Sequence, residues 1–370
     1  MNVILVFTYG ISIKEWDNLG ILSREVEIYK KMNKEYNVRF TFLTFGDHED
    51  EKYSHLINDL TIIPIYKYIN KSKTSIFNFF KTLIGVKKLI KLIEKPTVIK
   101  TNQLNGSWVA MMLKLHTKSP LYTRTGYNLF EFSVKDKKNI FKKIFYYLLT
   151  QISLVYSNNY SVTSNADKLF LEKYFYTKNI SVIPNWIADV KFNDFNNRYK
   201  NKILSVGRLE PQKNFFSLIK SLSNSNIELD LVGEGSEKKP LRKYADSLNV
   251  KLNLLGRLEH SDLNQHYLKY RIFILPSGFE GNPKVVLEAM AAGCIVVGTK
   301  IRSLEEIIDS GKNGFLFTPS EENILNLIEH LNNKNQELNN ISLAAIESIE
   351  TSNSIEKLMD LELQDYKNLT

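Results

Sequence analysis

The stretch IFILPSGFEGNPKVVLEAMAAG, residues 272–293, contains a strand, a loop and a helix in that order. Its first four residues, Ile272–Leu275, are a continuous apolar run of the kind that forms a buried strand in a parallel sheet. Pro283 suits the first position of a helix, where its missing N–H costs nothing, and Gly293 suits the position just after one. The stretch therefore predicts one strand–helix unit of a parallel α/β sheet.

Two carboxylates of this unit are expected to face one cleft. Glu280 lies in the loop, and Glu288 lies five residues into the helix, about 7–8 Å along its axis. Helix side chains tilt toward the N-terminus, so Glu288 can reach back toward Glu280. The amides near Lys284 and Val285 are at the helix start, where they favour a phosphate. Because carboxylates accept hydrogen bonds from hydroxyls, the pattern indicates a sugar nucleotide, with Glu288 on the ribose and Glu280 on the sugar.

The same order of strand and helix recurs along both halves of the chain, which predicts two doubly wound domains with parallel sheets. The expected strands are Val3–Thr8, Val38–Thr44, Thr97–Lys100, Leu121–Thr123, Tyr160–Thr163, Ile203–Val206, Glu228–Val232, Leu252–Leu255, Ile272–Leu275 and Ile295–Val297. A seam is expected near Pro184–Asn197, which has no periodicity and is rich in Asn and Asp. The domains are then residues 1–184 and 185–350, followed by a helix over 351–370 that can pack back on the first domain.

The composition is that of a globular protein: 43% of the 370 residues are hydrophobic and 24% are charged. This excludes a disordered chain and a disulfide-stapled miniprotein. The single cysteine, Cys294, fits a reducing compartment and is expected to be a packed core residue rather than a nucleophile. Residues 1–10 lack the positive stretch of a secretory signal, and no apolar run reaches the roughly 18–20 residues of a spanning helix. We therefore expect a cytoplasmic protein, at most associated with the inner face of the membrane.

Positive charge is concentrated in the first half of the chain. Residues 1–185 contain 27 Lys and Arg against 15 Asp and Glu, and within 60–145 the counts are 17 and 3. Such a field indicates an anionic partner. Residues 76–95 have an apolar helical stripe with lysines beside it, and 135–143 hold five more lysines. Two interpretations stay open: a packed helix with solvated lysines, or a helix lying on an anionic membrane. The sequence has no platform of alternating Arg and aromatic residues of the kind that binds single-stranded nucleic acid, so nucleic acid is not an expected partner.

Two further motifs follow expected strands of the second half. Gly207 and Arg208 come directly after one strand, and Lys213 lies five residues beyond Arg208. Two cations beside a helix start can bind a diphosphate, although loop cations are often only solvated. Gly233-Glu-Gly235 permits close approach of a ligand to the backbone or forms a simple tight turn. It lacks the third glycine of the dinucleotide fingerprint.

Glu280 and Glu288, with seven residues between them, resemble the E-x7-E signature of retaining glycosyltransferases of family 4, a family of glycosyltransferase group 1. The other blocks that agree in order and spacing are Ile183-Pro-Asn-Trp-Ile187, Gly207-Arg208 with Lys213, Gly233-Glu-Gly235, Leu255-Gly256-Arg257, Glu306-Ile-Ile and Gly311-Lys-Asn-Gly314. The resemblance covers about 155–320. It implies the glycosyltransferase B-type (GT-B) fold, in which two Rossmann-like domains face a deep cleft.

The resemblance also implies a role for each residue of the second domain. Arg208 and Lys213 would hold the diphosphate of a UDP- or GDP-sugar and stabilise its charge as it departs. These two residues and Glu280, which would contact the transferred sugar, are the implied catalytic residues. The implied donor-binding residues are Glu288, Gly207, Gly281, Asn282, Pro283, Lys284, Val285, Arg257, Gly233 and Gly235, with the base near Gly256 and Arg257. Transfer would retain the anomeric configuration without an obligatory metal or another cofactor.

The first domain is expected to bind a saccharide or lipid-linked acceptor, as in synthesis of cell-surface polysaccharide or glycolipid. Its candidate residues are Gly20, Arg124 and Gly126. The chain departs from many relatives here: one glycine stands in the first loop instead of two, and the loop around Arg124 has no histidine. Arg302-Ser303 also replaces a usual pair of glycines. An epimerase or a glycoside phosphorylase of the same fold, and a binding protein with an inactive site, remain alternatives, and the base, sugar, linkage and oligomeric state stay open.

Overall fold

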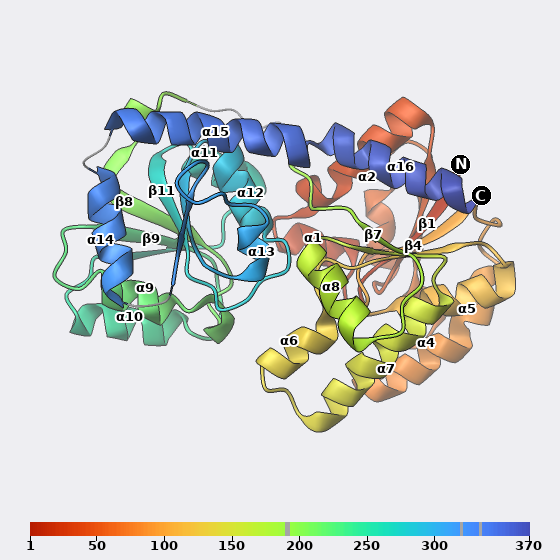
Figure 1. The fold of residues 1–370 in the computed structure, drawn as a ribbon. Coiled ribbons are helices and arrows are strands. Elements are labelled where there is room, and N and C mark those ends of the chain that lie inside the picture. Colours follow the sequence, from red (N-terminus) through yellow and green to blue (C-terminus); the bar gives the residue numbers. More distant parts are fainter. Residues whose placement is uncertain (189–192, 319–320, 333–334) are drawn as a thin grey trace. The chain divides into compact units, whose positions relative to one another are not determined.

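The computed structural model describes residues 1–188, 193–318, 321–332 and 335–370. The chain forms two compact units (Figure 1). Unit 1 consists of Met1–Pro184 and Leu358–Thr370, and unit 2 consists of Asn185–Lys357. Each unit is built on its own parallel sheet, as expected for an α/β protein with two doubly wound domains.

Unit 1 contains a seven-stranded parallel sheet with the order β3-β2-β1-β4-β5-β6-β7. The strands are β1 (Asn2–Val6), β2 (Arg39–Thr44), β3 (Thr61–Pro64), β4 (Val98–Thr101), β5 (Leu121–Arg124), β6 (Asn159–Val162) and β7 (Ile180–Val182). Strand β1 lies in the interior of the sheet, and its apolar run is buried because helices cover both faces of a parallel sheet.

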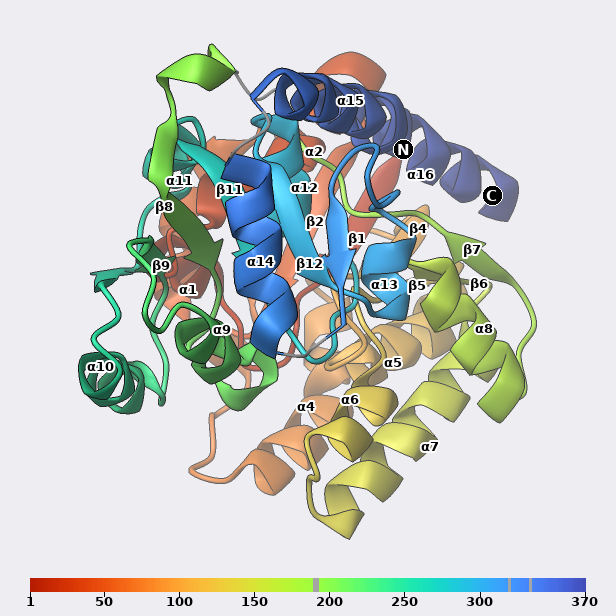
Figure 2. The same ribbon diagram turned by 60° about the vertical axis from the view of Figure 1, so that its left-hand side comes forward.

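The helices of unit 1 lie on both faces of this sheet. They are α1 (Ile13–Asn18), α2 (Leu22–Tyr36), α3 (Ile65–Tyr68), α4 (Ser75–Ile90), α5 (Ser107–Thr117), α6 (Leu129–Lys135), α7 (Ile140–Tyr156), α8 (Asn165–Tyr174) and most of α16 (Ile355–Leu369), with a 3-10 helix over His48–Leu56. Helices α2 and α16 lie on one side of the sheet, and α4, α5 and α7 lie on the other (Figures 1 and 2).

Unit 2 contains a six-stranded parallel sheet with the order β10-β9-β8-β11-β12-β13. The strands are β8 (Tyr199–Val206), β9 (Glu228–Val232), β10 (Leu252–Gly256), β11 (Tyr270–Leu275), β12 (Ile295–Thr299) and β13 (Phe315–Phe317). Its helices are α9 (Phe215–Ser221), α10 (Lys238–Ser247), α11 (His260–Tyr267), α12 (Lys284–Ala291), α13 (Arg302–Glu305), α14 (Glu321–Asn332) and α15 (Asn335–Asn353), with 3-10 turns over Phe195–Asn197 and Pro211–Lys213.

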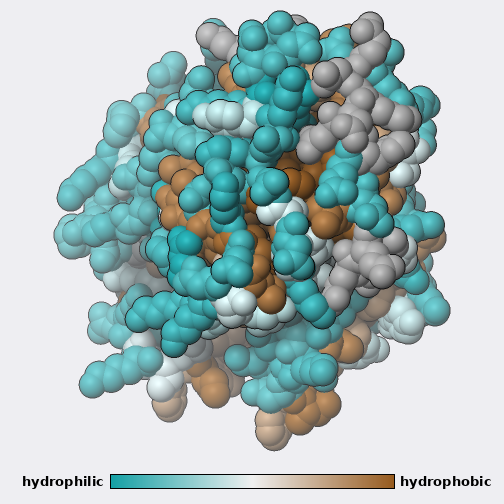
Figure 3. Space-filling view, turned by 90° about the vertical axis from the view of Figure 1, so that its left-hand side faces the viewer, coloured by the Kyte–Doolittle hydropathy of each residue, from teal (hydrophilic) through white to brown (hydrophobic). Residues whose placement is uncertain are grey.

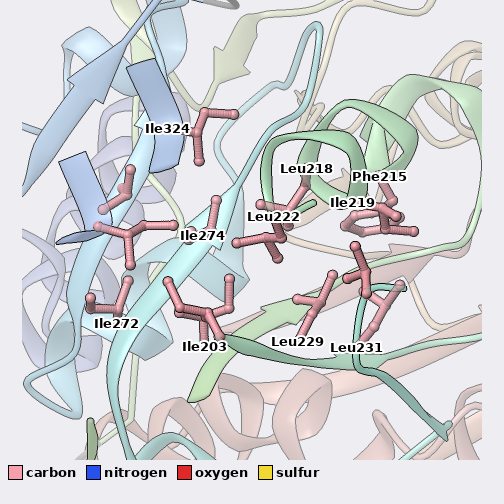
Figure 4. Close-up of a cluster of buried hydrophobic side chains, with 14 of the residues drawn as sticks. Ile203, Phe215, Leu218, Ile219, Leu222, Leu229, Leu231, Ile272, Ile274 and Ile324 are labelled. Carbon is pink, nitrogen blue, oxygen red and sulfur yellow. The ribbon is translucent and has the colours of Figure 1, made fainter. Parts of the chain in front are cut away.

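The core of unit 2 follows from the alternation of side chains along its strands. Ile272 and Ile274 point to the face covered by α9, where they pack with Leu218, Ile219 and other apolar side chains (Figure 4). Phe273 and Leu275 belong to the cluster on the opposite face, which α12 covers. Burying each such side chain stabilises the fold by roughly 1.5–3 kcal/mol.

Each of the ten expected strands is present, within a residue or two at its ends for most of them. Three short strands, β3, β7 and β13, are additional. One detail of the prediction was wrong: α12 begins at Lys284, and Pro283 is its N-cap with an extended backbone rather than its first helical residue. Cys294 is fully buried, as expected. Part of the expected seam, residues 189–192, lies outside the described residues.

The lengths and compositions of the helices decide whether any of them can cross a membrane. Over the residues that the structure describes, every helix is too short or too polar to span a bilayer. Hydrophilic side chains cover most of the face seen in Figure 3, on which α9, α10 and α14 of unit 2 lie.

Candidate functional site

The order of strands in unit 2 defines where a ligand can bind. Chain order reverses between β8 and β11, which are neighbours in the sheet. Open parallel sheets bind ligands outside the carboxyl ends of their strands at such a switch point. The loop after β8 carries Gly207–Lys213, and the loop after β11 carries Pro276–Pro283. Two motifs that are some 70 residues apart in the sequence therefore meet at one edge of the sheet.

Lys213 and Glu280 are in direct contact at this edge. The Nζ of Lys213 lies 2.6 Å from Oε1 of Glu280, and the two side chains are only 11% and 8% exposed. Gln212 ties the same two loops together, since its Nε2 donates to the Phe279 carbonyl at 2.8 Å and its own carbonyl accepts from the Gly278 amide at 2.9 Å. Because these bonds join the two loops, the ammonium and the carboxylate are held in place before any ligand binds.

Glu288 is buried in the second turn of α12, with 1% of the residue exposed. The Tyr267 hydroxyl donates to its Oε2 at 3.1 Å, and Nε2 of His260 lies 3.4 Å from its Oε1. Both partners come from α11. Sequence patterns identified neither residue, because nothing in the spacing of the six histidines distinguishes His260 from the others. Only the contacts of the two side chains with Glu288 mark them as part of the site. The structure thus fixes the carboxylate of Glu288 from two directions.

The seam segment supports the loop between the two glutamates. The Asn185 amide donates to Oδ1 of Asn282 at 3.0 Å, and the Asn185 side chain donates to the Asn282 carbonyl at 2.6 Å. The next residue, Trp186, has its ring 4.8 Å from Nζ of Lys284. These contacts give a physical reason for the Ile183–Ile187 block: it positions the start of α12, where Gly281 and Asn282 are buried and Pro283 caps the helix.

The glycines of the loop after β9 pack against the backbone of the loop after β8. A Cβ atom on Gly233 would lie 1.9 Å from the Gly207 carbonyl oxygen, and one on Gly235 would lie 2.3 Å from the Leu209 carbonyl oxygen. The Leu209 amide also donates to the Glu234 carbonyl at 3.0 Å. The close approach is therefore between two loops of the protein, which supports the tight-turn interpretation at these positions.

Gly233→Ala is expected to destabilise unit 2 by about 2 kcal/mol, because it combines a clash with the backbone and a φ of +144° that side chains disfavour. Urea denaturation checks this. Gly311→Ala is the matched control: Gly311 has a φ of +86° but open space around its Cβ position, so its smaller loss reports the φ cost alone. Equal losses in the two variants would contradict the tight packing of the two loops.

The two expected arginines are placed at the same edge of the sheet but are exposed. Within the described residues, no hydrogen bond or ion pair holds the guanidinium of Arg208, which follows Gly207. Arg257 comes directly after β10. Strand β10 is two strands away from β8, so its end lies roughly 10 Å from the end of β8. The carboxyl edge therefore carries cations over a width that suits a nucleotide diphosphate.

Two of the three candidates of unit 1, Arg124 and Gly126, lie at the end of β5 and in the loop after it. Gly20 lies shortly after α1 with a φ of +66°. Arg124 ends β5, and its guanidinium donates to the carbonyls of Ile183 and Pro184 at 3.1 and 3.2 Å. The Gly126 amide donates to Oε1 of Gln103 at 2.8 Å, which joins the loops after β4 and β5. The structure thus gives Arg124 and Gly126 contacts within the protein.

No group of three or more His, Cys, Asp or Glu side chains in the described part of the chain is arranged to hold a metal ion. Among the charged residues that the sequence singled out at the carboxyl edge of unit 2, Lys213 and Glu288 are buried, and the side chain of Glu280 is only 8% exposed.

Both halves of the chain match models of known families. The model described as glycosyl transferases group 1 matches residues 188–348, and the one described as glycosyl transferase 4-like matches residues 32–159. The chain belongs to the glycosyltransferases. The first match covers nearly all of unit 2, including both glutamates, and the second lies within unit 1.

Three relatives of this glycosyltransferase are also named as sugar transferases. An uncharacterized glycosyltransferase of Haemophilus influenzae is 31% identical over 161 residues, which are 41% of this chain and 45% of that protein. A Campylobacter jejuni enzyme named GalNAc-alpha-(1->4)-GalNAc-alpha-(1->3)-diNAcBac-PP-undecaprenol alpha-1,4-N-acetyl-D-galactosaminyltransferase is 22% identical over 284 residues, covering 74% and 76% of the two chains. An Escherichia coli enzyme named UDP-Gal:alpha-D-GlcNAc-diphosphoundecaprenol alpha-1,3-galactosyltransferase is 28% identical over 264 residues, covering 65% and 67%.

Solved structures confirm the fold of this glycosyltransferase. Anabaena HepE in complex with UDP and glucose superposes with a TM-score of 0.78 at 16% identity over 100% of both chains. Sucrose-phosphate synthase from Thermosynechococcus elongatus gives a TM-score of 0.80 at 14% identity over 100% of this chain and 99% of that one. At such identities the likeness concerns the fold, which is GT-B, as the sequence predicted.

Proposed function

We propose that this protein is a retaining glycosyltransferase of family 4 that moves a sugar from a nucleoside diphosphate donor to a lipid-linked or glycan acceptor in the synthesis of a cell-surface polysaccharide or glycolipid. The observation that carries the proposal is the Lys213–Glu280 pair at the switch point of unit 2. A buried ammonium at this place suits a diphosphate, and a neighbouring carboxylate suits sugar hydroxyls. UDP is the first donor nucleotide to test, since HepE was solved with UDP and with UDP-glucose; GDP is the second.

In this proposal the carboxyl edge of unit 2 binds the donor from base to sugar. The base lies near Arg257, and Glu288 holds the ribose. Arg208 and Lys213 bind the diphosphate, with the first amides of α12, at Lys284 and Val285, directed at the same anion because a helix N-terminus favours negative charge. Glu280 orients the transferred sugar through its hydroxyls.

The reaction exchanges one bond at the anomeric carbon for another. The bond from that carbon to the diphosphate oxygen breaks, the acceptor oxygen bonds to the carbon on the same face of the sugar, and the acceptor proton is released. Negative charge develops on the departing diphosphate. Lys213 and Arg208 stabilise that charge, and the contact of Lys213 with Glu280 positions its ammonium before the reaction starts. Neither a metal ion nor another cofactor is required in this scheme.

The acceptor is proposed to bind to unit 1. The C. jejuni and E. coli relatives are named for acceptors on undecaprenol diphosphate, which is a membrane lipid. We extend this acceptor class to the present chain, with a cytoplasmic enzyme in peripheral contact with an anionic membrane. Nucleic acid is not a partner in this proposal.

Thermal unfolding in the presence of nucleotides tests the donor site. A ligand at about 100 times its Kd stabilises the folded state by about 2.7 kcal/mol, which raises the melting temperature of a unit of this size by roughly 5–10 °C. We expect this shift with UDP or GDP but not with AMP, and its loss in Lys213→Met. Absence of any shift with all nucleoside diphosphates, for a protein that melts cooperatively, would contradict the donor site.

Product analysis then separates transfer from the alternatives. Labelled UDP-sugar is incubated with the protein alone and with membrane lipid extract, and the anomeric configuration of the product is read by NMR. Transfer with retention, only when acceptor is present, is the expected result. A change in the donor without acceptor would identify an epimerase, and binding without any turnover would identify an inactive binding protein. Release of sugar 1-phosphate from an oligosaccharide and inorganic phosphate, with no nucleotide sugar present, would identify a glycoside phosphorylase.

A further inference from the structure

Helices α4 and α7 of unit 1 expose large apolar side chains along much of their length. On α4 these include Phe77, Phe80 and Ile84, of which Ile84 is 72% exposed. On α7 they include Phe141, Ile144 and Leu148, and Phe141 is 80% exposed. We call these six residues the α4–α7 face. Contiguous exposed apolar surface of this kind marks an interaction site in a soluble protein.

The two helices belong to one surface. The rings of Phe79 on α4 and Phe145 on α7 pack with their centroids 5.9 Å apart, and both contact Trp108 of α5. In Figures 1 and 2 the two helices run along the same outer side of unit 1, with α5 next to them. The apolar side chains of α4 and α7 therefore form one face rather than two separate patches.

The buried sides of these helices carry polar as well as apolar residues, while several of their largest apolar side chains are exposed. The buried side of α4 includes Asn78 and Thr82, and Thr82 accepts a hydrogen bond from the Trp108 indole at 3.1 Å. The buried side of α7 includes Thr150 and Ser153. A helix whose partner is water buries its apolar residues and exposes its polar ones. Here many of the largest apolar residues are outside, which indicates an apolar partner.

Positive charge continues the same stripe. Phe80, Ile84, Lys87 and Lys91 follow the i, i+4, i+7, i+11 spacing of one helix side, and both lysines are exposed. Lys142, also exposed, follows directly after Phe141. Neither helix contains an Asp or Glu. The surface thus combines aromatic and aliphatic side chains with cations only, a combination that fits a layer whose interior is apolar and whose surface is anionic.

We propose that the α4–α7 face docks the protein on the surface of an anionic lipid bilayer, with its aromatic and aliphatic side chains at the level of the acyl chains and its lysines among the headgroups. The inference rests on the proposed function only in that a lipid-linked acceptor places the reaction at a membrane. A second copy of the chain is a poorer occupant, because a twofold interface would bring the same lysines against each other.

Sedimentation of the full chain with lipid vesicles tests the proposal. Vesicles contain either phosphatidylcholine alone or phosphatidylcholine with roughly 30% phosphatidylglycerol, at about 0.05 M and about 0.5 M NaCl. We expect binding to the anionic vesicles at low salt. On neutral vesicles, or at high salt, we expect the partition coefficient to fall by a factor of about ten or more. Failure of the wild-type chain to bind anionic vesicles would overturn the proposal.

Matched variants assign the binding to the surface. Phe141→Ser with Leu148→Ser, and Lys87→Gln with Lys91→Gln, are each expected to lower the partition coefficient about tenfold or more. Leu169→Ser with Leu343→Ser changes two exposed leucines on α8 and α15, and Lys239→Gln with Lys243→Gln changes two exposed lysines on α10. These control variants are expected to bind as the wild type does. Equal binding by all variants would overturn the assignment.

Two parallel measurements distinguish membrane docking from self-association and from a change in the donor site. Analytical ultracentrifugation without lipid is expected to show no self-association through this face; a dimer that Phe141→Ser with Leu148→Ser dissociates would overturn the membrane proposal in favour of a second copy. The melting temperature with and without UDP is measured on the same samples. For the variants that change α4 or α7, we expect loss of vesicle binding with an unchanged shift in melting temperature on adding UDP. A wild-type chain that binds vesicles but shows no such shift would contradict the donor site and leave the docking surface supported.

Discussion

Lys213→Met is expected to lower kcat for sugar transfer by a factor of about 10²–10³, the usual effect of removing one group that stabilises transition-state charge. The ammonium of Lys213 is held 2.6 Å from Glu280 in a site with little exposure to water, so its field on a departing diphosphate is weakly screened. Methionine keeps most of the length of the side chain and its apolar contact over Gly207, where the lysine Cε would lie 3.1 Å from an added Cβ. The loss then reports the charge and not the packing.

Glu280→Gln is expected to reduce transfer as well, and the double variant separates its two possible roles. If Glu280 acts only by positioning Lys213, Glu280→Gln with Lys213→Met is no slower than Lys213→Met alone, because the pair behaves as one unit. If Glu280 also holds the sugar, the double variant is slower. The steady-state parameters kcat and KM are measured for all three proteins with saturating acceptor.

Lys239→Met serves as the control for a changed lysine in unit 2, since Lys239 is exposed on α10. It is expected to turn over at the wild-type rate. A Lys213→Met variant that keeps a kcat within about threefold of wild type while remaining folded would show that the diphosphate lies elsewhere, and the donor site would then have to be moved from the switch point.

The strands were predictable because a buried parallel strand has a simple composition. Ile203–Val206 and Ile272–Leu275 are short, largely apolar runs, and both belong to strands at the centre of the sheet of unit 2. Strands β3 and β13 have only four and three residues, and a run that short cannot be separated from an apolar turn by periodicity. Tertiary pairing with β2 and β12 decides their conformation.

The contacts of the candidate site were less predictable, because they join residues far apart in the chain. Glu280 and Glu288 were marked by their spacing, but the pairing of Lys213 with Glu280 depends on β8 and β11 being neighbours. His260 has no motif around it that would distinguish it from the other histidines. Gly233-Glu-Gly235 was compatible with close approach of a ligand or with a tight turn, and the structure shows that the missing side chains make room for carbonyl groups of the protein itself.

The outward apolar side of α4 shows a different limit of sequence patterns. Periodicity detects a stripe, but it does not tell which side of the helix faces the core. Within residues 76–95, for which an apolar stripe was predicted, Ile76 and Phe80 are exposed and Val86 is buried. The core contact of this helix is made partly by polar side chains through a hydrogen bond to Trp108, and a pattern of apolar residues alone cannot find such an interface.

The last helix of the chain is joined to unit 1 by a buried ion pair, and breaking it is expected to cost the fold the most stability. Lys100 on β4 contacts Glu362 on α16, and both side chains are only 2% exposed. The Tyr366 hydroxyl also donates to Glu362, and the ring of Tyr29 lies 4.9 Å from Nζ of Lys100. Burial alone would raise the pKa of Glu362, but the nearby charges of Lys100 and Arg124 hold it below its ordinary value of 4.5.

Glu362→Gln is therefore expected to lower the free energy of unfolding of unit 1 by about 3–5 kcal/mol, because it leaves the Lys100 charge buried without its partner. Lys100→Met with Glu362→Leu removes both charges and is expected to recover most of this loss, since well-packed apolar residues replace a buried pair at little cost. Urea denaturation at pH 7 measures both changes. Glu362→Gln with wild-type stability, or a double variant as unstable as the single one, would contradict the pair's role.

The pH dependence gives an independent check on the same pair. The pKa of Glu362 is lower in the folded state than in the unfolded chain, so as the pH falls below about 5 the unfolded chain takes up the proton first. The stability that the pair contributes is present above the unfolded pKa and is lost as the pH falls through the folded pKa. The wild type is therefore expected to lose stability in acid more steeply than Glu362→Gln, and parallel curves for the two proteins between about pH 3 and pH 6 would show that the carboxylate is not ionised in the native state.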